Sequence, residues 1–213
     1  MQTRRDPDPP SETELDRLVA ATEGLQPWRR VAHASTGLAL GLVPPLLQWD
    51  RTTTVIVLTS ILVLQIALDV VRFRVEAIQK LFFTVLSRLA SPREARGTSS
   101  STWYTVSAII VYGLFPTGIA SSSILVLGLA DPAAGTVGRL FGRRKFGTGS
   151  MEGSATFFVT AMLVLLIAVD WPVALAAALA ATVIEVIPGI GDDNLIIPVV
   201  TGSVLWLLLS API

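Results

Sequence analysis

The chain has 213 residues, of which 52% are hydrophobic and only 15% are charged. Soluble domains carry about 25% charged residues, so the composition predicts an integral membrane protein and argues against a soluble one. The formal net charge is zero, which argues against a nucleic-acid partner, and the lack of cysteine excludes disulfides and cysteine metal sites.

Residues 1–27 are predicted to form a cytoplasmic tail with a short amphipathic helix. The first residues are polar and proline-rich, without the apolar core of a signal peptide. Ser11 and Glu14 have the spacing of a capping box, and Leu15 and Leu18 begin a roughly helical apolar pattern. We expect this helix to lie at the membrane interface.

Residues 28–213 are predicted to form a membrane-embedded, all-α catalytic domain. A membrane-spanning helix needs roughly 20 mostly apolar residues, and about 17 are tolerated. The stretch 97–130 has no charged residue, is too long for one span, and contains a Pro-Gly hinge at which we divide it. A second interfacial helix is expected at 72–96. The expected spans, about seven, are residues 31–49, 52–68, 103–115, 117–130, 153–169, 171–187 and 195–209.

The basic residues predict the orientation of these spans. If the helices alternate across the bilayer, the loops on the N-terminal side hold every Lys and Arg residue except Arg51, which is 15 of the 16 in the chain. Cytoplasmic loops carry an excess of Lys and Arg. The N-terminus and the polar loops are therefore predicted to face the cytoplasm.

Residues 131–152 are predicted to form a cytoplasmic loop that binds phosphate. Glycines allow backbone N–H groups to approach phosphate oxygens, and nearby Arg and Lys supply countercharge. Asp131 and Glu152 would oppose an anion unless Mg²⁺ lies between them and the phosphates. A simple stop-transfer loop is the alternative. The expected phosphate ligands are Gly135, Gly138, Gly142, Arg139, Arg143, Arg144 and Lys145.

A second group of polar residues lies between the last two expected spans. Glu185 stands within an apolar run, and an ionisable residue at membrane depth indicates function by default. Asp192, Asp193 and Asn194 offer hard oxygen ligands for Mg²⁺. The alternative is helix capping, for which Asp and Asn are favoured. One cap needs one such residue, so we favour a metal site.

Three further segments have both a structural and a functional interpretation. His33, the only histidine, stands at the mouth of the first span. Asp69 and Arg72 are three residues apart and could form a local ion pair, or Asp69 could be a base or metal ligand. Glu94 and Arg96 precede a Ser/Thr run, which is either a plain loop or a phosphate contact.

Taken together, these segments resemble the family of CTP-dependent lipid-alcohol kinases, which includes dolichol kinase, phytol kinase and the CTP-dependent diacylglycerol kinase. The similar motifs are "RRVAHASTG", "LDVVR", "RGTSSSTWY", "DPAAGTVGRLFGRRKFGTGSMEG" and "IEVIPGIGDDNLIIP". One departure is Gly149, because family members often have Lys directly before the Ser at position 150. Phosphatidate cytidylyltransferases are more distantly similar, and this chain does not contain their late Lys-Asp…His-Gly-Gly…Asp-Arg signature.

The resemblance implies transfer of the γ-phosphoryl group of CTP to a membrane lipid alcohol (polyprenol, phytol or diacylglycerol) at the cytoplasmic face, with Mg²⁺ as cofactor. The alternatives are a CTP-dependent cytidylyltransferase acting on a lipid phosphate and, third, a membrane transporter. A homo-oligomer is compatible with the sequence. The implied proton acceptors are Asp69, His33 and Glu185. The implied Mg²⁺ ligands are Asp131, Glu152, Asp192, Asp193 and Asn194. Ser150, Arg72 and Arg96 join the implied nucleotide and phosphate ligands.

Overall fold

The computed structural model describes residues 13–22 and 26–210, and within these ranges the chain is almost entirely helical. A short antiparallel hairpin, β1 (Lys145–Phe146) and β2 (Gly149–Ser150), is a small departure from the all-α prediction. The described helices are α1 (Glu14–Ala20), α2 (Pro27–Leu46), α3 (Arg51–Arg74), α4 (Glu76–Val85), the 3₁₀ helix η1 (Pro92–Ala95), α5 (Ser100–Leu114), α6 (Thr117–Phe141), α7 (Met151–Leu165), α8 (Trp171–Val186) and α9 (Asp193–Ser210).

Each expected span corresponds to one helix. In chain order these helices are α2, α3, α5, α6, α7, α8 and α9. Three of the described helices, α3, α6 and α9, are long and apolar enough to cross a membrane, and α7 and α8 are shorter apolar helices. The number of membrane crossings stays a prediction. The division of the stretch 97–130 is confirmed, because α5 ends at Leu114 and Pro116 caps the start of α6.

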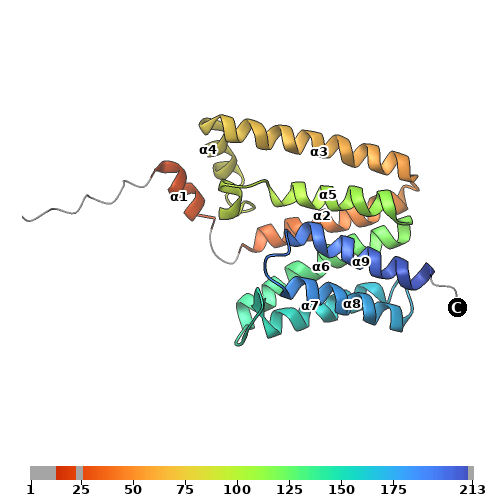
Figure 1. The fold of residues 1–213 in the computed structure, drawn as a ribbon. Helices are drawn as coiled ribbons and strands as arrows, with labels where there is room; N and C mark the ends of the chain where they lie inside the picture. Colours follow the sequence, from red (N-terminus) through yellow and green to blue (C-terminus); the bar gives the residue numbers. More distant parts are fainter. Residues whose placement is uncertain (1–12, 23–25, 211–213) are drawn as a thin grey trace, which may run out of the picture.

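The long helices lie side by side in a bundle, with α6 packed against α2, α7 and α9 (Figure 1). The core is formed by fully buried side chains such as Leu127 of α6 and Phe157 of α7. Gly37 of α2 faces Gly128 of α6, and a Cβ atom at Gly128 would lie 2.6 Å from the Cα atom of Gly37. Glycine at both positions therefore allows these two helices to pack with their backbones in contact.

Helix α3 presents a large apolar surface to its surroundings. Ile56, Val63 and Leu64 are each about 60% exposed, and only 17% of the most apolar part of this helix is buried inside the protein. Such an apolar face is typical of a surface that meets another apolar phase, and it agrees with the expected lipid contact.

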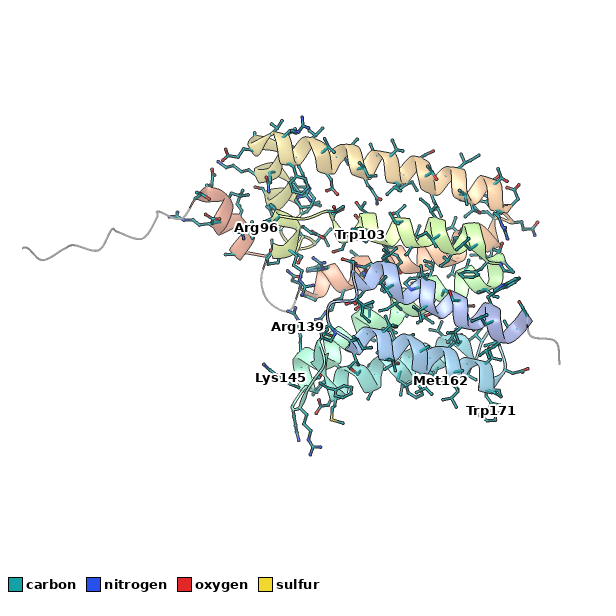
Figure 2. All side chains as sticks on the ribbon, viewed as in Figure 1. Arg96, Trp103, Arg139, Lys145, Met162 and Trp171 are labelled. Carbon is teal, nitrogen blue, oxygen red and sulfur yellow. The ribbon has the colours of Figure 1, made fainter. Side chains whose placement is uncertain are left out.

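One end of the bundle carries the polar elements. Helices α1 and α4 and the β hairpin all lie at this end, which we call the polar end (Figure 1). Arg96, Arg139 and Lys145 lie there, whereas Trp171 lies at the opposite end (Figure 2). The fold thus gathers the cytoplasmic loops of the sequence prediction at one end of the bundle.

The predicted loop 131–152 is wrong in its first half, because α6 continues through Asp131 to Phe141. Small residues explain this extension. A Cβ atom at Gly138 would lie 3.1 Å from Oγ of Ser150 and 3.5 Å from Cα of Gly153. Helix α6 therefore packs closely on the start of α7, and tertiary contacts keep this segment helical beyond the buried Pro132.

The two predicted interfacial helices also differ from the structure. Ser11 lies outside the described residues, and the observed capping box of α1 joins Thr13 to Asp16. Glu14 instead pairs with Lys80 of α4 at 2.9 Å, and this hydrogen bond lowers the pKa of the Glu14 carboxyl below its ordinary value. The expected helix 72–96 is divided into the end of α3, then α4, and then η1, because the backbone is extended at Val75 between α3 and α4.

Candidate functional site

A polar cavity of about 600 Å³ opens at the polar end of the bundle. Its walls come from the start of α2, from η1 and the segment that follows it, from the C-terminal half of α6, and from the start of α9. The ionisable residues that line it are Arg29, Arg30, His33, Arg93, Glu94, Asp131, Arg139, Asp192 and Asp193.

A second cavity of about 550 Å³ is largely apolar and lies between α2, α3, α4 and α5. Leu81, Phe82 and Val85 of α4 contribute to its apolar wall, and Gln65 and Asp69 of α3 contribute polar groups. An apolar cavity with a few polar groups is the usual form of a small-molecule site.

The two cavities share four lining residues: Arg29, His33, Glu94 and Ser100. Their side chains form the boundary between a charged compartment and an apolar one. A molecule in the polar cavity and another in the apolar cavity would therefore meet at this boundary. We call these four residues the junction.

Hydrogen bonds hold the junction in place. Nη2 of Arg29 donates to Oγ of Ser100 at 2.7 Å and lies 3.8 Å from Oε1 of Glu94. The same Oε1 accepts the main-chain N–H of Ser100 at 2.9 Å, and Oε2 accepts the main-chain N–H of Ser91 at 3.1 Å. Glu94 is buried and makes these fixed bonds, so it positions Arg29 and the start of α5.

Three nitrogen atoms around the polar cavity are buried and have no hydrogen-bond partner among the described residues. They are Nη1 of Arg29, Nη1 of Arg30 and Nε2 of His33. Buried polar groups are normally hydrogen-bonded, so each exception calls for an explanation. Two guanidinium donors beside one cavity are suited to an anionic ligand, because Arg binds phosphate with charge-assisted hydrogen bonds.

His33 is held between two helices. Its ring stacks on Tyr104 of α5 with centroids 4.9 Å apart, and the main-chain carbonyl of Leu127 on α6 accepts a hydrogen bond from the ring. Nε2 lies 3.7 Å from Oδ2 of Asp131. The sequence left open whether His33 has a structural or a functional role, and the fold places it at the junction.

Four of the five predicted Mg²⁺ ligands lie at the same cavity. Asp131, Asp192, Asp193 and Asn194 all line the polar cavity, and the carboxylate of Asp193 is within Coulombic range of Asp131 and Asp192. Oδ1 of Asp192 accepts both the main-chain N–H and the side-chain amide of Asn194, at 3.0 and 2.8 Å. Asp192 therefore also has the capping role considered as the alternative.

The other predicted Mg²⁺ ligand and one predicted base lie elsewhere. Glu152 accepts the main-chain N–H of Arg143 at 3.1 Å, and Glu185 accepts the hydroxyl of Ser154 at 3.1 Å. Neither lines the two cavities. Within the part of the chain that the structure describes, no three His, Cys, Asp or Glu side chains form a metal-binding cluster.

The predicted phosphate ligands are divided between the cavity and the hairpin region. Arg139 and Gly135 line the polar cavity, and Gly135 faces the guanidinium of Arg30. Gly138 instead packs on the start of α7, where Ser150 caps the helix by accepting the N–H of Gly153 at 3.1 Å. Four predicted ligands are exposed at or beside the hairpin and outside the cavity: Gly142, Arg143, Arg144 and Lys145.

Asp69 and Arg72 form the local ion pair considered in the sequence analysis. Nε of Arg72 donates to Oδ1 of Asp69 at 2.7 Å, and the other guanidinium nitrogens donate to the carbonyls of Glu94 and Gly97. Oδ2 of Asp69 accepts the main-chain N–H of Ser99 at 3.1 Å. These bonds favour a structural role that ties α3 to the start of α5.

Arg96 is exposed and lies within Coulombic range of Asp16 rather than in the polar cavity.

Sequence reasoning missed Arg29, Arg30, Arg93 and Ser100 as site residues. A signal for Arg29 and Arg30 was present, because a basic pair one helical turn before the only histidine lies on the same helix face.

Comparison with known proteins identifies relatives of this chain. No family model matches it, and no solved structure matches it significantly. It is 30% identical to "CTP-dependent diacylglycerol kinase 1" of Schizosaccharomyces pombe, over 66% of this chain and 74% of that protein. It is 29% identical to the protein of the same name from Eremothecium gossypii, over 63% of this chain but only 43% of that protein. The chain therefore belongs to the family of the CTP-dependent diacylglycerol kinases.

Proposed function

We propose that the chain transfers the γ-phosphoryl group of CTP to the hydroxyl of a membrane lipid alcohol. The observation that carries this proposal is the junction, where a cavity lined by four arginines meets an apolar cavity through Arg29, His33, Glu94 and Ser100. The relatives are named as CTP-dependent diacylglycerol kinases, and their name supports CTP as the donor. Diacylglycerol, phytol and polyprenols all fit an apolar cavity as acceptors.

The reaction would take place at one face of the membrane. The exposed apolar surface of α3 and the long apolar helices support an integral membrane protein. The polar cavity lies at the polar end, on which nearly all basic residues are expected. With the positive-inside rule, this asymmetry supports a cytoplasmic active site within the catalytic domain, residues 28–213.

The arginines of the polar cavity would hold the triphosphate. Arg29 and Arg30 line this cavity, and each has a buried Nη1 atom without a hydrogen-bond partner among the described residues. Arg93 and Arg139 line the same cavity from η1 and α6. Phosphoryl transfer requires the protein mainly to position the phosphates and to neutralise their charge, and four guanidinium groups provide both.

The residues present also fit Mg²⁺. Asp131 and Asp193 line the polar cavity and are within Coulombic range of each other, so their mutual repulsion favours a bound cation. Mg²⁺ is usually held by one or two carboxylates together with substrate phosphates, so a site of three protein ligands is not required. Bound there, it would neutralise charge on the transferring phosphoryl group.

The chemistry of transfer follows from the position of His33. The lipid hydroxyl oxygen would attack the γ-phosphorus, and the bond to the β-phosphate oxygen would break, with CDP leaving with the electron pair. The hydroxyl proton would pass to Nε2 of His33, which has no hydrogen-bond partner among the described residues. Asp131, 3.7 Å away, would stabilise the charge that His33 then carries.

A labelling experiment tests this proposal. Purified protein in detergent or lipid nanodiscs is supplied with Mg²⁺, a lipid alcohol and CTP labelled at either the α or the γ position. We expect label in the lipid only from γ-labelled CTP. Transfer of the α label to a lipid phosphate would instead show a cytidylyltransferase. Labelled ATP in a parallel series determines whether the donor is specific.

A further inference from the structure

Gln65 is a polar residue within the apolar cavity that the proposed phosphoryl transfer does not use. It lies on α3 and lines this cavity. Its amide oxygen, Oε1, is buried and has no hydrogen-bond partner among the described residues. Because a buried polar atom without a partner is costly, a group that the cavity receives from outside would explain its presence.

Gln65 lies deeper in the bundle than the junction. It precedes Asp69 by four residues, which is about 6 Å along a helix, and α3 runs antiparallel to α2 and α5 (Figure 1). Thr36 follows His33 by three residues on α2, and Tyr104 follows Ser100 by four on α5, and both also line the apolar cavity. Gln65 therefore lies on the membrane side of the junction.

A lipid in this cavity would present different groups to the junction and to Gln65. With its hydroxyl at the junction, its next few bonds would pass Gln65. A polyprenol has only hydrocarbon there, whereas a glycerolipid has ester groups. Oε1 accepts a hydrogen bond from a hydroxyl, whereas an ester carbonyl is itself an acceptor. A half-turn about the last torsion of Gln65 puts Nε2 in the place of the buried Oε1, and the nitrogen then donates to the ester carbonyl. Gln65 can therefore bind either a hydroxyl or an ester carbonyl.

We propose that Gln65 selects lipid alcohols that carry a second hydrogen-bonding group close to the reacting hydroxyl. This inference rests on the proposed function, since it concerns the acceptor of the phosphoryl group. A site built to hydrogen-bond a substrate discriminates strongly against an analogue without the bonding group, because the buried group of the protein is then left unpaired. Gln65 thus favours a glycerolipid over an isoprenoid alcohol.

The test replaces Gln65 by Met, which has a similar length and no hydrogen-bonding amide. The value of kcat/KM is measured for a diacylglycerol and for a polyprenol. For the wild type we expect a preference for the diacylglycerol. In Gln65→Met we expect kcat/KM for the diacylglycerol to fall about tenfold or more, and that for the polyprenol to stay equal or rise. Ser60→Ala is the matched control, because Ser60 is exposed on the same helix and its hydroxyl donates to the carbonyl of Ile56 in that helix.

Two outcomes would overturn the role of Gln65. One is an equal loss of kcat/KM for both alcohols, which would indicate a general effect on folding, to be compared with the Tm of each variant. The other is no change for the diacylglycerol.

If the wild type phosphorylates neither alcohol, the proposed kinase activity fails. The role of Gln65 is then decided by native mass spectrometry of both lipids bound to the wild type and to Gln65→Met. Diacylglycerol binding that is weakened in the variant, with polyprenol binding unchanged, would support it. Equal binding of diacylglycerol to both proteins would refute it.

Discussion

His33 of α2 and Asp131 of α6 lie 98 positions apart in the chain, yet Nε2 of the histidine is 3.7 Å from Oδ2 of the aspartate. Both side chains line the polar cavity, and His33 also lines the apolar one. The packing of α2 on α6, which the facing glycines Gly37 and Gly128 permit, brings the two residues together. This pair therefore lies where the polar cavity, the proposed nucleotide site, meets the apolar cavity, the proposed lipid site.

His33→Gln tests the proposed proton acceptor. General base catalysis contributes about 10²- to 10⁴-fold to a rate, so we expect kcat to fall at least about 100-fold with little change in the KM for CTP. Ser35→Ala is the control, because Ser35 is exposed on the same helix and does not line the two cavities. An unchanged kcat in His33→Gln would remove His33 from the mechanism.

Arg30→Gln tests whether the triphosphate binds in the polar cavity or at the hairpin. A hydrogen bond to a charged group is worth about 1.5–3 kcal/mol, so we expect the KM for CTP to rise about tenfold or more. The KM for the lipid should stay the same. Arg144→Gln is the matched control, because Arg144 is exposed beside the hairpin and outside the cavity. A larger effect from Arg144 would support the phosphate-binding loop of the sequence prediction instead.

Asp193→Asn tests the proposed Mg²⁺ ligand. Loss of one of two carboxylates weakens the attraction for the cation, so the Mg²⁺ concentration for half-maximal activity should rise about tenfold or more. Asp170→Asn is the control, since Asp170 is exposed and directly precedes Trp171, which lies at the opposite end of the bundle (Figure 2). If Asp193→Asn leaves the Mg²⁺ dependence unchanged, the ligand assignment is wrong.

Gly37→Ala and Gly113→Ala test the close packing of α2 on α6. A Cβ atom at Gly37 would overlap the backbone of Gly128 and the hydroxyl of Tyr104, whereas nothing lies within 4 Å of one at Gly113. Overpacking typically costs about 1–3 kcal/mol, and Gly to Ala in an open helix position stabilises by up to about 1 kcal/mol. We therefore expect a lower Tm for Gly37→Ala in a thermal unfolding assay and an equal or higher one for Gly113→Ala. Equal Tm values for both variants would contradict the close helix contact.

Much of the fold could be predicted from the chain alone, because membrane helices are encoded locally. Runs of apolar residues between charges predicted a helix at every position where the structure has a long one, and Pro116 predicted the break between α5 and α6. The errors lie at the polar end. Charged and glycine-rich sequence suggested a loop after Asp131, but packing of Gly138 on Gly153 keeps α6 helical to Phe141.

The candidate site was only partly predictable. Asp131, Arg139 and Asp193 were selected from their residue types and lie on the polar cavity. Arg144 and Lys145 were selected for the same reason and lie outside it, at and beside the hairpin, which projects from the bundle (Figure 1). The residue type indicates which chemistry a side chain can perform. The position of that side chain in the fold depends on contacts between helices.

The sequence by itself determined the helical class, the positions of the long helices and the asymmetry of charge, because hydropathy and charge act over one or two helical turns. It also pointed to the family, through motifs that resemble it, and the comparison confirms the family. Only the tertiary structure decided which charged residues share a cavity and that Asp69 is held by Arg72 and the backbone of Ser99. It also decided that Gln65 lines the apolar cavity, with an Oε1 atom that has no hydrogen-bond partner among the described residues. Those relationships join residues from different helices, and they depend on how closely and in what register the helices pack.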